Sequence, residues 1–396
     1  MATIEVPTLS VLNPEFQRDP YAAFARARER SWIVSTELGY QVLTYDACVE
    51  LMRDRRFQNG GEKLARMSGI TSGPFFDAWT SSILYSRGAD HVRLKKILTP
   101  FFGFKAVEQM RVLARRLMNE YLDEGGEELE FMTQVASRLP AALFCQMVDV
   151  PFSEAAFISR ISDSLLKIFF MDPRYREEIE AAYTELDTFV RDLIAQRRKN
   201  PGEDLVSTAI AAHEAGDRLT EEETVNLVAT VLEASTDNTS NQIALALALL
   251  IEHPDQWDLL RADPSLLRSA VEECCRFSPR IYVAQRMADE AIEFRGFRIP
   301  DNEWILPSVA SAHRDPNAYP EPDRFDITRK PMPPQLIFGG GEHACIGAPL
   351  ARIELQEALA VIAERCARVE FAAPPGRIPS SNVQALSELR LRFTAA

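Results

Sequence analysis

Residues 338–352 read FGGGEHACIGAPLAR, and this stretch indicates more about the fold than any other part of the chain. Pro349 suits the first turn of a helix, so Cys345 stands just before a helix N-terminus. Unpaired backbone amides and the helix dipole stabilise a thiolate at such a position. The three preceding glycines let the backbone pass close to a flat or bulky group. The pattern favours a metal ligand or a nucleophile at Cys345, and the alternative is an inert core cysteine.

Two other kinds of site fit this loop poorly. A phosphate-binding loop needs a Lys-Ser/Thr pair after its glycines, and none follows here. A structural zinc site needs a second cysteine at short spacing, and Cys345 has no such neighbour.

The composition is that of a soluble globular protein. The chain has 396 residues, 46% of them hydrophobic, and a formal net charge of −14. The acidic balance argues against nucleic acid and anionic membranes as partners. The longest apolar run, residues 243–251, is far shorter than the roughly 20 residues of a membrane span. With no secretory signal and six scattered cysteines, we expect a reduced cytoplasmic protein.

The hydrophobic patterning predicts a helix-dominated chain with minor β structure, forming one domain over residues 1–396. An Asp301-Asn302 turn predicts a small hairpin over residues 292–306, and six prolines exclude continuous helix or central strand over residues 316–334. The clearest predicted elements are helices at 20–30, 107–122, 177–198 and 348–367, and short strands at 41–44, 369–372 and 389–393.

One predicted helix is unusually long and carries a polar middle. A capping box of Thr220 and Glu223 starts it, and His253 with Pro254 ends it. Residues 235–240 read STDNTS, a run of polar and poor helix formers inside an apolar helix. Such a run is costly in the interior unless its groups are satisfied or used. Two interpretations stay open: a widened turn beside a reaction centre, or a solvent-exposed midsection.

The loop resembles the haem-binding loop of the cytochrome P450 family, Phe-Gly-x-Gly-x-His/Arg-x-Cys-x-Gly. All six fixed positions match, namely Phe338, Gly339, Gly341, His343, Cys345 and Gly347. The resemblance implies haem b, iron protoporphyrin IX, with Cys345 as axial thiolate and His343 at a propionate. It also implies a mainly α fold with small β-sheets, in which haem lies between the long helix and the cysteine loop.

Two further motifs follow the family's order. Glu273 and Arg276 match its Glu-x-x-Arg, although Glu272 and Arg276 also have the spacing of an ordinary surface pair. Arg324, in the proline-rich segment, matches the third member of a buried ion network. The resemblance implies a structural role for these three residues.

The resemblance also implies haem propionate contacts elsewhere. His91 and Lys95 match a His-x-x-x-Arg on an early helix, with lysine in place of arginine, which loses the bidentate fork. Arg286 matches the arginine that reaches the other propionate. A partly exposed basic residue is the ordinary alternative for each.

The polar middle of the long helix corresponds to the family's oxygen-activation motif. Asp237 retains the acid, but Asn238 stands where the family has threonine. An amide can donate and accept hydrogen bonds but has no rotating hydroxyl. Thr239 lies about 100° further round the helix and does not simply replace the missing threonine. We expect Asp237 to relay protons through water that Asn238 or the substrate positions.

The resemblance implies a monooxygenase that inserts one atom of dioxygen into a small or medium-sized hydrophobic substrate. Electrons would come from NAD(P)H through a separate ferredoxin reductase and ferredoxin, and Arg93, Lys95 and Lys96 are candidate docking residues. By family position the substrate pocket draws on Phe76, Ala234, Ile281, Tyr282, Val283 and Gln384. Two alternatives remain: a haem-thiolate enzyme that uses peroxide or catalyses coupling or isomerisation, and a non-enzymatic haem-binding sensor.

Overall fold

The computed structural model describes residues 6–215 and 219–396. The chain forms two compact units, each built from three separate stretches. The first unit contains the described residues of Met1–Gly60, Leu245–Cys345 and Pro374–Glu388, and the second contains those of Gly61–Ala244, Ile346–Ala373 and Leu389–Ala396. The single domain expected from the sequence stays a prediction.

The first unit combines short helices with small sheets. Its main sheet has the order β1-β2-β8, with β1 and β2 antiparallel and β2 and β8 parallel. Its helices are α1 (Pro14–Arg18), α2 (Pro20–Arg28), α3 (Tyr45–Arg53), α14 (Pro254–Ala262), α15 (Leu267–Phe277) and α16 (Val309–Ala312). Its strands are β1 (Ile33–Thr36), β2 (Gly39–Val42), β3 (Phe57–Gln58), β5 (Met287–Ala288), β6 (Ile292–Phe294), β7 (Phe297–Ile299), β8 (Ile305–Pro307), β10 (Gly376–Ile378) and β11 (Ala385–Glu388).

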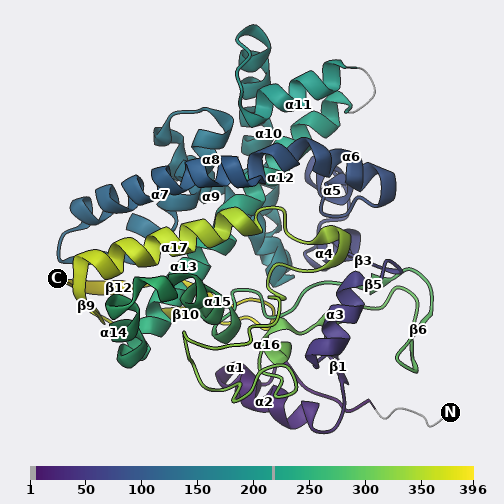
Figure 1. Ribbon diagram of the computed structural model, residues 1–396. Helices are drawn as coiled ribbons and strands as arrows, with labels where there is room; N and C mark the ends of the chain where they lie inside the picture. Colours follow the sequence, from purple (N-terminus) through teal and green to yellow (C-terminus); the bar gives the residue numbers. More distant parts are fainter. Residues whose placement is uncertain (1–5, 216–218) are drawn as a thin grey trace. The chain divides into compact units, whose positions relative to one another are not determined.

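The second unit is mainly helical, and α17 runs along α7 (Figure 1). Its sheet has the order β4-β12-β9, with both pairings antiparallel. Its helices are α4 (Gly61–Met67), α5 (Pro74–Ser81), α6 (Gly88–Leu98), α7 (Phe104–Gly125), α8 (Arg138–Val148), α9 (Ala155–Leu165), α10 (Arg176–Lys199), α11 (Leu205–Glu214), α12 (Glu221–Ser235) and α17 (Ala348–Arg365). Its strands are β4 (Glu128–Glu130), β9 (Cys366–Phe371) and β12 (Arg390–Ala395), and α13 (Asp237–Glu252) crosses from this unit into the first.

The helix-dominated pattern predicted from the sequence is confirmed, with one correction in the β structure. The 292–306 segment does form a hairpin, but β6 and β7 close it through Arg295 and Gly296, both in the left-handed region of backbone space. The Asp301-Asn302 turn instead leads into β8, which pairs with β2. Both turns carry typical turn residues, and only pairing with β2 decides where the hairpin ends.

The long helix is interrupted where its sequence turns polar. Its capping box is present: the Glu223 amide donates to Thr220 Oγ1 at 3.1 Å, and the Thr220 amide donates to Glu223 Oε2 at 2.8 Å. α12 ends at Ser235 and α13 begins at Asp237, with Thr236 between them at φ −103° and ψ −69°. Of residues 235–240, three are buried, three are half-buried and none is exposed, which contradicts the solvent-exposed alternative. No helix in the described ranges has both the length and the apolar character needed to cross a membrane.

A buried ion network holds the proline-rich segment of the first unit to α15. Glu273 and Arg276, both 0% exposed, form two hydrogen bonds of 2.7 Å. Arg276 also donates to three backbone carbonyls, those of His313, Pro322 and Arg324. The guanidinium therefore replaces the regular backbone partners that this proline-rich segment lacks.

The third member of this network is Arg329 and not Arg324. Arg329 Nε lies 3.2 Å from both carboxylate oxygens of Glu273, and its side chain is 7% exposed. The Arg324 side chain is 61% exposed and pairs with Glu321 at 3.5 Å and Asp326 at 3.8 Å. Arg324 contributes only its carbonyl oxygen, which both buried arginines use.

This assignment can be tested by unfolding variants in denaturant. We expect Glu273→Gln to lower the free energy of unfolding by about 3–5 kcal/mol, because it leaves two buried guanidinium groups without their carboxylate. Arg329→Gln is expected to cost about 1–3 kcal/mol, and the matched surface change Arg324→Gln about 0.5 kcal/mol or less. An Arg324→Gln variant as unstable as Arg329→Gln would contradict the assignment.

Candidate functional site

The cysteine loop of the first unit is a tight, hydrogen-bonded turn that presents Cys345. A single 3₁₀ turn covers Gly341–His343, and the Cys345 amide donates to the Phe338 carbonyl at 2.8 Å. Pro349 lies in the first turn of α17, which begins at Ala348. Cys345 is exposed, whereas the other five cysteines are buried. Burial raises the pKa of Cys145 to about 12 and that of Cys274 well above 9, so these two thiols stay protonated.

The glycines of this loop serve its packing against α3. Gly341 has φ +69°, and a Cβ there would lie 2.7 Å from the Met52 carbonyl oxygen. A Cβ at Gly340 would meet Met52 Cβ at 3.1 Å. Gly340 and Gly341 therefore allow a close approach to Met52, and the expectation that the glycines clear space for a bulky group stays a prediction.

Arg286 of the first unit is a buried cation with polar neighbours but no carboxylate. Its Nη1 donates to Asn59 Oδ1 at 2.6 Å and to the Gln285 carbonyl at 2.7 Å. Burial lowers the pKa of Arg286 to about 10, and only the charge of Glu342 opposes that effect. A buried guanidinium without a paired carboxylate is suited to an anionic ligand group. His343 lies on the cysteine loop, with Nε2 3.7 Å from Glu342 Oε1.

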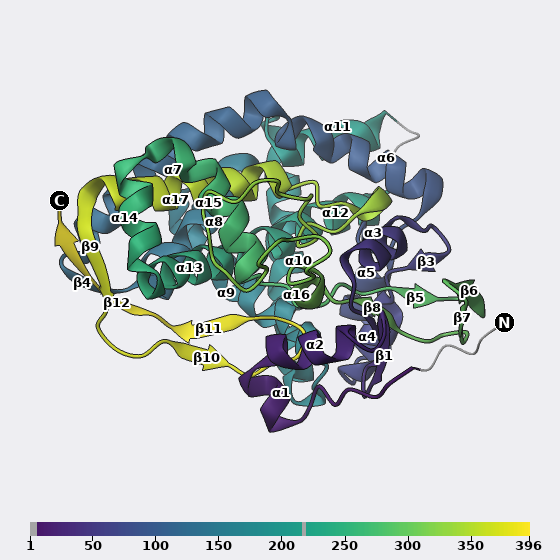
Figure 2. The ribbon, with the colours of Figure 1, turned by 60° about the horizontal axis from the view of Figure 1, so that its bottom comes forward.

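Two of the predicted pocket residues in the first unit line one cavity. Tyr282 and Gln384 border a cavity of about 580 Å³ together with residues of α1 and α2. Gln384 lies just before β11 of the β10–β11 hairpin (Figure 2). Its backbone amide donates to the Arg280 carbonyl at 2.7 Å. Ile281 pairs with Val383 and Val283 with Ser308, so both belong to the backbone pairing beside this cavity.

In the second unit, His91 and Lys95 lie one turn apart on α6 and share a face of that helix. His91 is buried, with Nδ1 3.2 Å from the Ile83 carbonyl oxygen, which can only accept a hydrogen bond. Arg93 is held in ion pairs with Glu223 at 2.6 Å and Asp90 at 3.0 Å, so its charge is largely neutralised. The docking role of Arg93 stays a prediction; its charge is paired, whereas Lys96 is exposed.

The polar side chains at the interruption between α12 and α13 differ in hydrogen bonding and in burial. Asp237 Oδ1 accepts from Asn241 Nδ2 at 2.9 Å. Asn238 is half-buried, and its side chain makes no hydrogen bond within residues 6–215 and 219–396. Thr239 is buried on a different side of the helix turn. An acid and an amide next to an interrupted helix can hold water and pass protons.

Ala234 and Phe76, the two predicted pocket residues that belong to the second unit, differ in their exposure. Ala234 is exposed, although the residues before it on α12, from Leu227 to Glu233, are buried. Phe76 is half-buried, and the Arg66 guanidinium lies 5.3 Å from its ring centroid. Its neighbour Phe75 is the one that packs inward.

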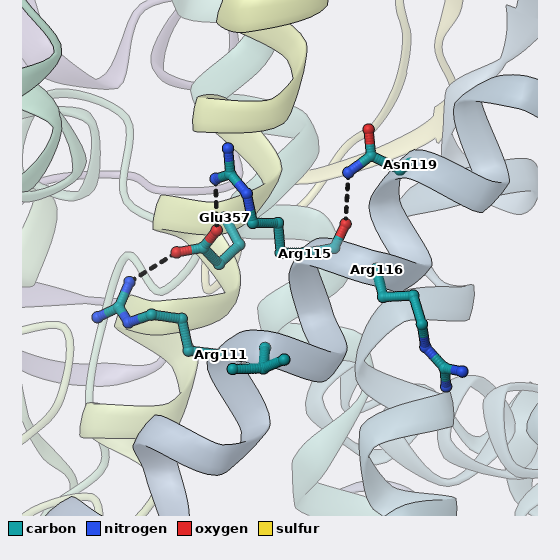
Figure 3. Close-up of a pocket in the computed structure, with 6 residues that line it drawn as sticks. Arg111, Arg115, Arg116, Asn119 and Glu357 are labelled. Carbon is teal, nitrogen blue, oxygen red and sulfur yellow. Dashed lines mark hydrogen bonds and ion pairs between the residues drawn. The ribbon is translucent and has the colours of Figure 1, made fainter.

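A groove of about 450 Å³ runs between α7 and α17 in the second unit (Figure 3). Arg111 and Arg115 of α7 turn toward Glu357 of α17, at 2.7 and 3.1 Å, whereas Arg116 points away from this carboxylate. Val112 also lines the groove and is 73% exposed. The α7 side of the groove thus combines cationic groups with an exposed apolar side chain, and α17, the helix that follows Cys345 in the chain, contributes Glu357.

Comparison with known proteins identifies the class. The family model for cytochrome P450 matches residues 143–377. The chain belongs to the cytochrome P450 family and is an oxidoreductase of its monooxygenase class. The family's haem-thiolate chemistry fits the residues present, since Cys345 is exposed and Arg286 is a buried cation without a paired carboxylate.

Particular relatives place the chain among bacterial members. It is 34% identical to luteothin monooxygenase from Streptomyces thioluteus, over 99% of this chain and 97% of that protein. It is 35% identical to nocardicin C N-oxygenase from Nocardia uniformis, over 75% of each. The crystal structure of CalO2 superposes with a TM-score of 0.90 at 25% identity, over 98% of this chain and 99% of that one. The mainly α fold with small sheets expected from the resemblance is confirmed.

Proposed function

We propose that Cys345 is the thiolate ligand of haem iron in a monooxygenase that oxidises a small or medium-sized hydrophobic molecule. The observation that carries the proposal is an exposed cysteine three residues before α17, on the loop whose fixed positions match the family. Bound haem iron supplies the activation of dioxygen, from which one oxygen atom enters the substrate. The names of the relatives, a monooxygenase and an N-oxygenase, support oxidation of a small molecule as the reaction class.

The proposed haem contacts have two kinds of support, the physical environment of a residue or its match to a family motif. For Arg286, the support is physical: a buried guanidinium without a paired carboxylate gains a partner in a haem propionate. For His343, His91 and Lys95, it is their match to the family's motif positions. The roles of these residues are to neutralise and orient the propionates, and the N-terminal end of α17 stabilises the Cys345 thiolate.

Proton delivery is assigned to the interruption of the long helix. Asp237 holds and passes the proton, with its carboxylate oriented by Asn241. Asn238 positions the water that Asp237 serves, because its amide makes no hydrogen bond within the described chain. Thr239 supports the helix turn and does not take the place of the family's threonine.

The electron donor is proposed to be a ferredoxin, reduced by NAD(P)H through its reductase. The kind of donor is inferred from surface chemistry, because cationic and exposed apolar side chains on this protein suit an acidic surface on a ferredoxin-type partner. Val92 on α6 and Val112 on α7 are exposed, and the same two helices carry the exposed side chains of Lys96 and Arg116, the latter in a long, exposed ion pair with Glu120 at 3.8 Å. α17, which borders the Arg116 groove, starts three residues after Cys345.

The first test is the carbon monoxide difference spectrum of the reduced protein. We expect a red-shifted Soret band typical of thiolate-bound iron, and its loss in Cys345→His. The matched control Cys366→Ser, a buried cysteine at the end of α17, should keep the band. A Cys345→His variant with the wild-type spectrum would overturn the assignment, and a haem-free wild type would overturn the proposed function.

A second test concerns Asn238. We expect Asn238→Ala to lower the product formed per electron pair by up to about tenfold, because one water-positioning hydrogen bond is lost. Asn238→Thr, which restores the family's residue, should keep or raise this ratio. Product and consumed NADH are measured together with both variants. Unchanged coupling in Asn238→Ala would contradict the role, and turnover with hydrogen peroxide in place of the ferredoxin would favour the peroxide-using alternative.

A third test concerns the donor. Charge reversal in Lys96→Glu and Arg116→Glu is expected to slow reduction by ferredoxin by roughly tenfold at low salt, with a smaller effect at high salt. Arg368→Glu on β9 makes the same change in net charge and is the control. Stopped-flow absorbance of the iron gives the rates. Equal slowing by all three variants would show a net-charge effect and contradict a docking surface on α6 and α7.

A further inference from the structure

A small cavity in the second unit contains a carboxyl group that the proposed oxygen chemistry does not use. Residues of α5, α10 and α12 line it, among them Phe75, Trp79, Ser82, Tyr183, Asn226 and Glu233. Its volume is about 10 Å³, which is room for about one water-sized group.

Glu233 is the only carboxyl residue among those that line this cavity, and it is only 7% exposed. Its Oε1 is buried and has no hydrogen-bond partner within the described chain, and Ser82 Oγ is in the same state. The backbone carbonyl of Glu233 accepts from Ser162 Oγ at 2.8 Å, so the helix itself is held without the carboxyl group. An isolated buried carboxyl costs stability, and its presence calls for a function or a ligand.

The polar neighbours of Glu233 are already used by other partners. Asn226 Nδ2 donates to the Ala78 carbonyl at 2.8 Å, and Thr230 Oγ1 donates to Asn226 Oδ1 at 3.1 Å. Burial alone raises the pKa of Glu233 to about 8, so no charged side chain offsets the cost of ionisation. The phenols of Tyr85 and Tyr183 stay neutral, because burial raises their pKa values well above 10 and to about 12. What this environment lacks is a positive charge.

The walls of the cavity have the chemistry that attracts a cation. The ring centroids of Phe75 and Trp79 stack at 5.6 Å, and Tyr183 meets Phe75 edge-on at 5.7 Å. Tyr85, which is outside the cavity lining, packs on Trp79 at 5.2 Å. Aromatic faces bind ammonium groups through the negative potential above the ring. The three aromatic rings that line the cavity beside an unpaired carboxyl therefore favour an amine over a neutral or anionic group.

We propose that Glu233 and the surrounding aromatic rings form a subsite for the protonated primary amine of the substrate. The water-sized volume admits an –NH₃⁺ group and excludes a trimethylammonium group. Glu233 precedes the exposed Ala234 and lies four residues before Asp237, so the subsite and the proposed proton relay belong to the same interrupted helix. The inference rests on the proposed function, and it names the class of substrate.

The test compares probes of equal chain length on the holoenzyme. Octylamine, 1-octanol and octyltrimethylammonium are titrated by calorimetry into the reduced, carbon monoxide-bound protein, whose iron cannot take the amine. At pH 8.5 we expect wild type to prefer octylamine over 1-octanol by at least about tenfold, the size of a partly desolvated ion pair with cation–π contact. Octyltrimethylammonium should bind no better than the alcohol.

Variants separate the carboxyl group from the rest of the fold. Glu233→Gln should abolish the amine preference while leaving 1-octanol binding unchanged, and Glu233→Asp should keep part of the preference. Glu354→Gln is the matched control, because Glu354 on α17 is another buried carboxyl whose pKa burial alone raises. Amine preference in Glu233→Gln equal to wild type would overturn the proposal, as would equal loss of both probes in that variant.

The pH dependence gives an independent readout. Below pH 8, Glu233 is protonated and must release its proton to bind an ammonium ion. The affinity for octylamine should therefore rise with pH, by up to about tenfold per unit, and level off above pH 8. Octanol binding, and both probes with Glu233→Gln, should show no such rise. A flat octylamine profile in wild type would overturn the subsite.

Failure of the subsite and failure of the proposed function give different results. If the wild type lacks the thiolate-type spectrum, the monooxygenase proposal fails, and calorimetry with the same probes still decides the amine preference. If the spectrum is present but the preference is absent or independent of Glu233, only the subsite fails.

Discussion

The cysteine-bearing unit depends on the ion pairs made by the buried carboxylate of Glu273. It pairs with Arg276 and Arg329, whose remaining donors bind backbone carbonyls of the proline-rich segment. Arg276 also binds the His313 carbonyl, and the His313 ring accepts from the Leu336 amide at 3.1 Å, two residues before the cysteine loop begins. Burial lowers the pKa of His313 to about 3, so the ring stays neutral and able to accept. A segment that prolines exclude from helix and sheet is thus ordered by side chains.

The long helix shows how local environment gives two acids of one helix different chemistry. Asp237 lies at the interruption, half-buried, with an amide partner from the next turn. Glu233 lies four residues earlier, inside an aromatic cluster and without a partner for Oε1. A hydrogen-bonded acid next to accessible space suits proton transfer, and an isolated buried acid suits recognition of a cation. The polar stretch is tolerated in this helix because several of its hydroxyl groups donate hydrogen bonds to helix carbonyls. Ser240 Oγ, for example, donates to the Thr236 carbonyl at 2.8 Å.

Sequence reasoning succeeded where a function depends on residues close together in the chain. The Thr220–Glu223 capping box and the Glu273–Arg276 pair are confirmed, because three-residue spacing places their members on one turn. It failed for Arg324, because two arginines five residues apart in a segment without periodicity cannot be told apart by spacing. It also gave no sign that Gly340 and Gly341 pack against Met52, nearly 300 residues earlier.

The sequence by itself determined the helix-dominated class and the family, and it predicts Cys345 as the haem ligand, since motif spacing and hydrophobic period are local properties of the chain. Only the tertiary structure decided which arginine completes the buried network, that Arg93 is neutralised by Glu223, and that Arg286 is a buried cation without a paired carboxylate. It alone also showed that Glu233 is isolated among aromatic rings. The physical reason is that burial and ion pairing depend on residues brought together from distant parts of the chain, and no local pattern records those partners.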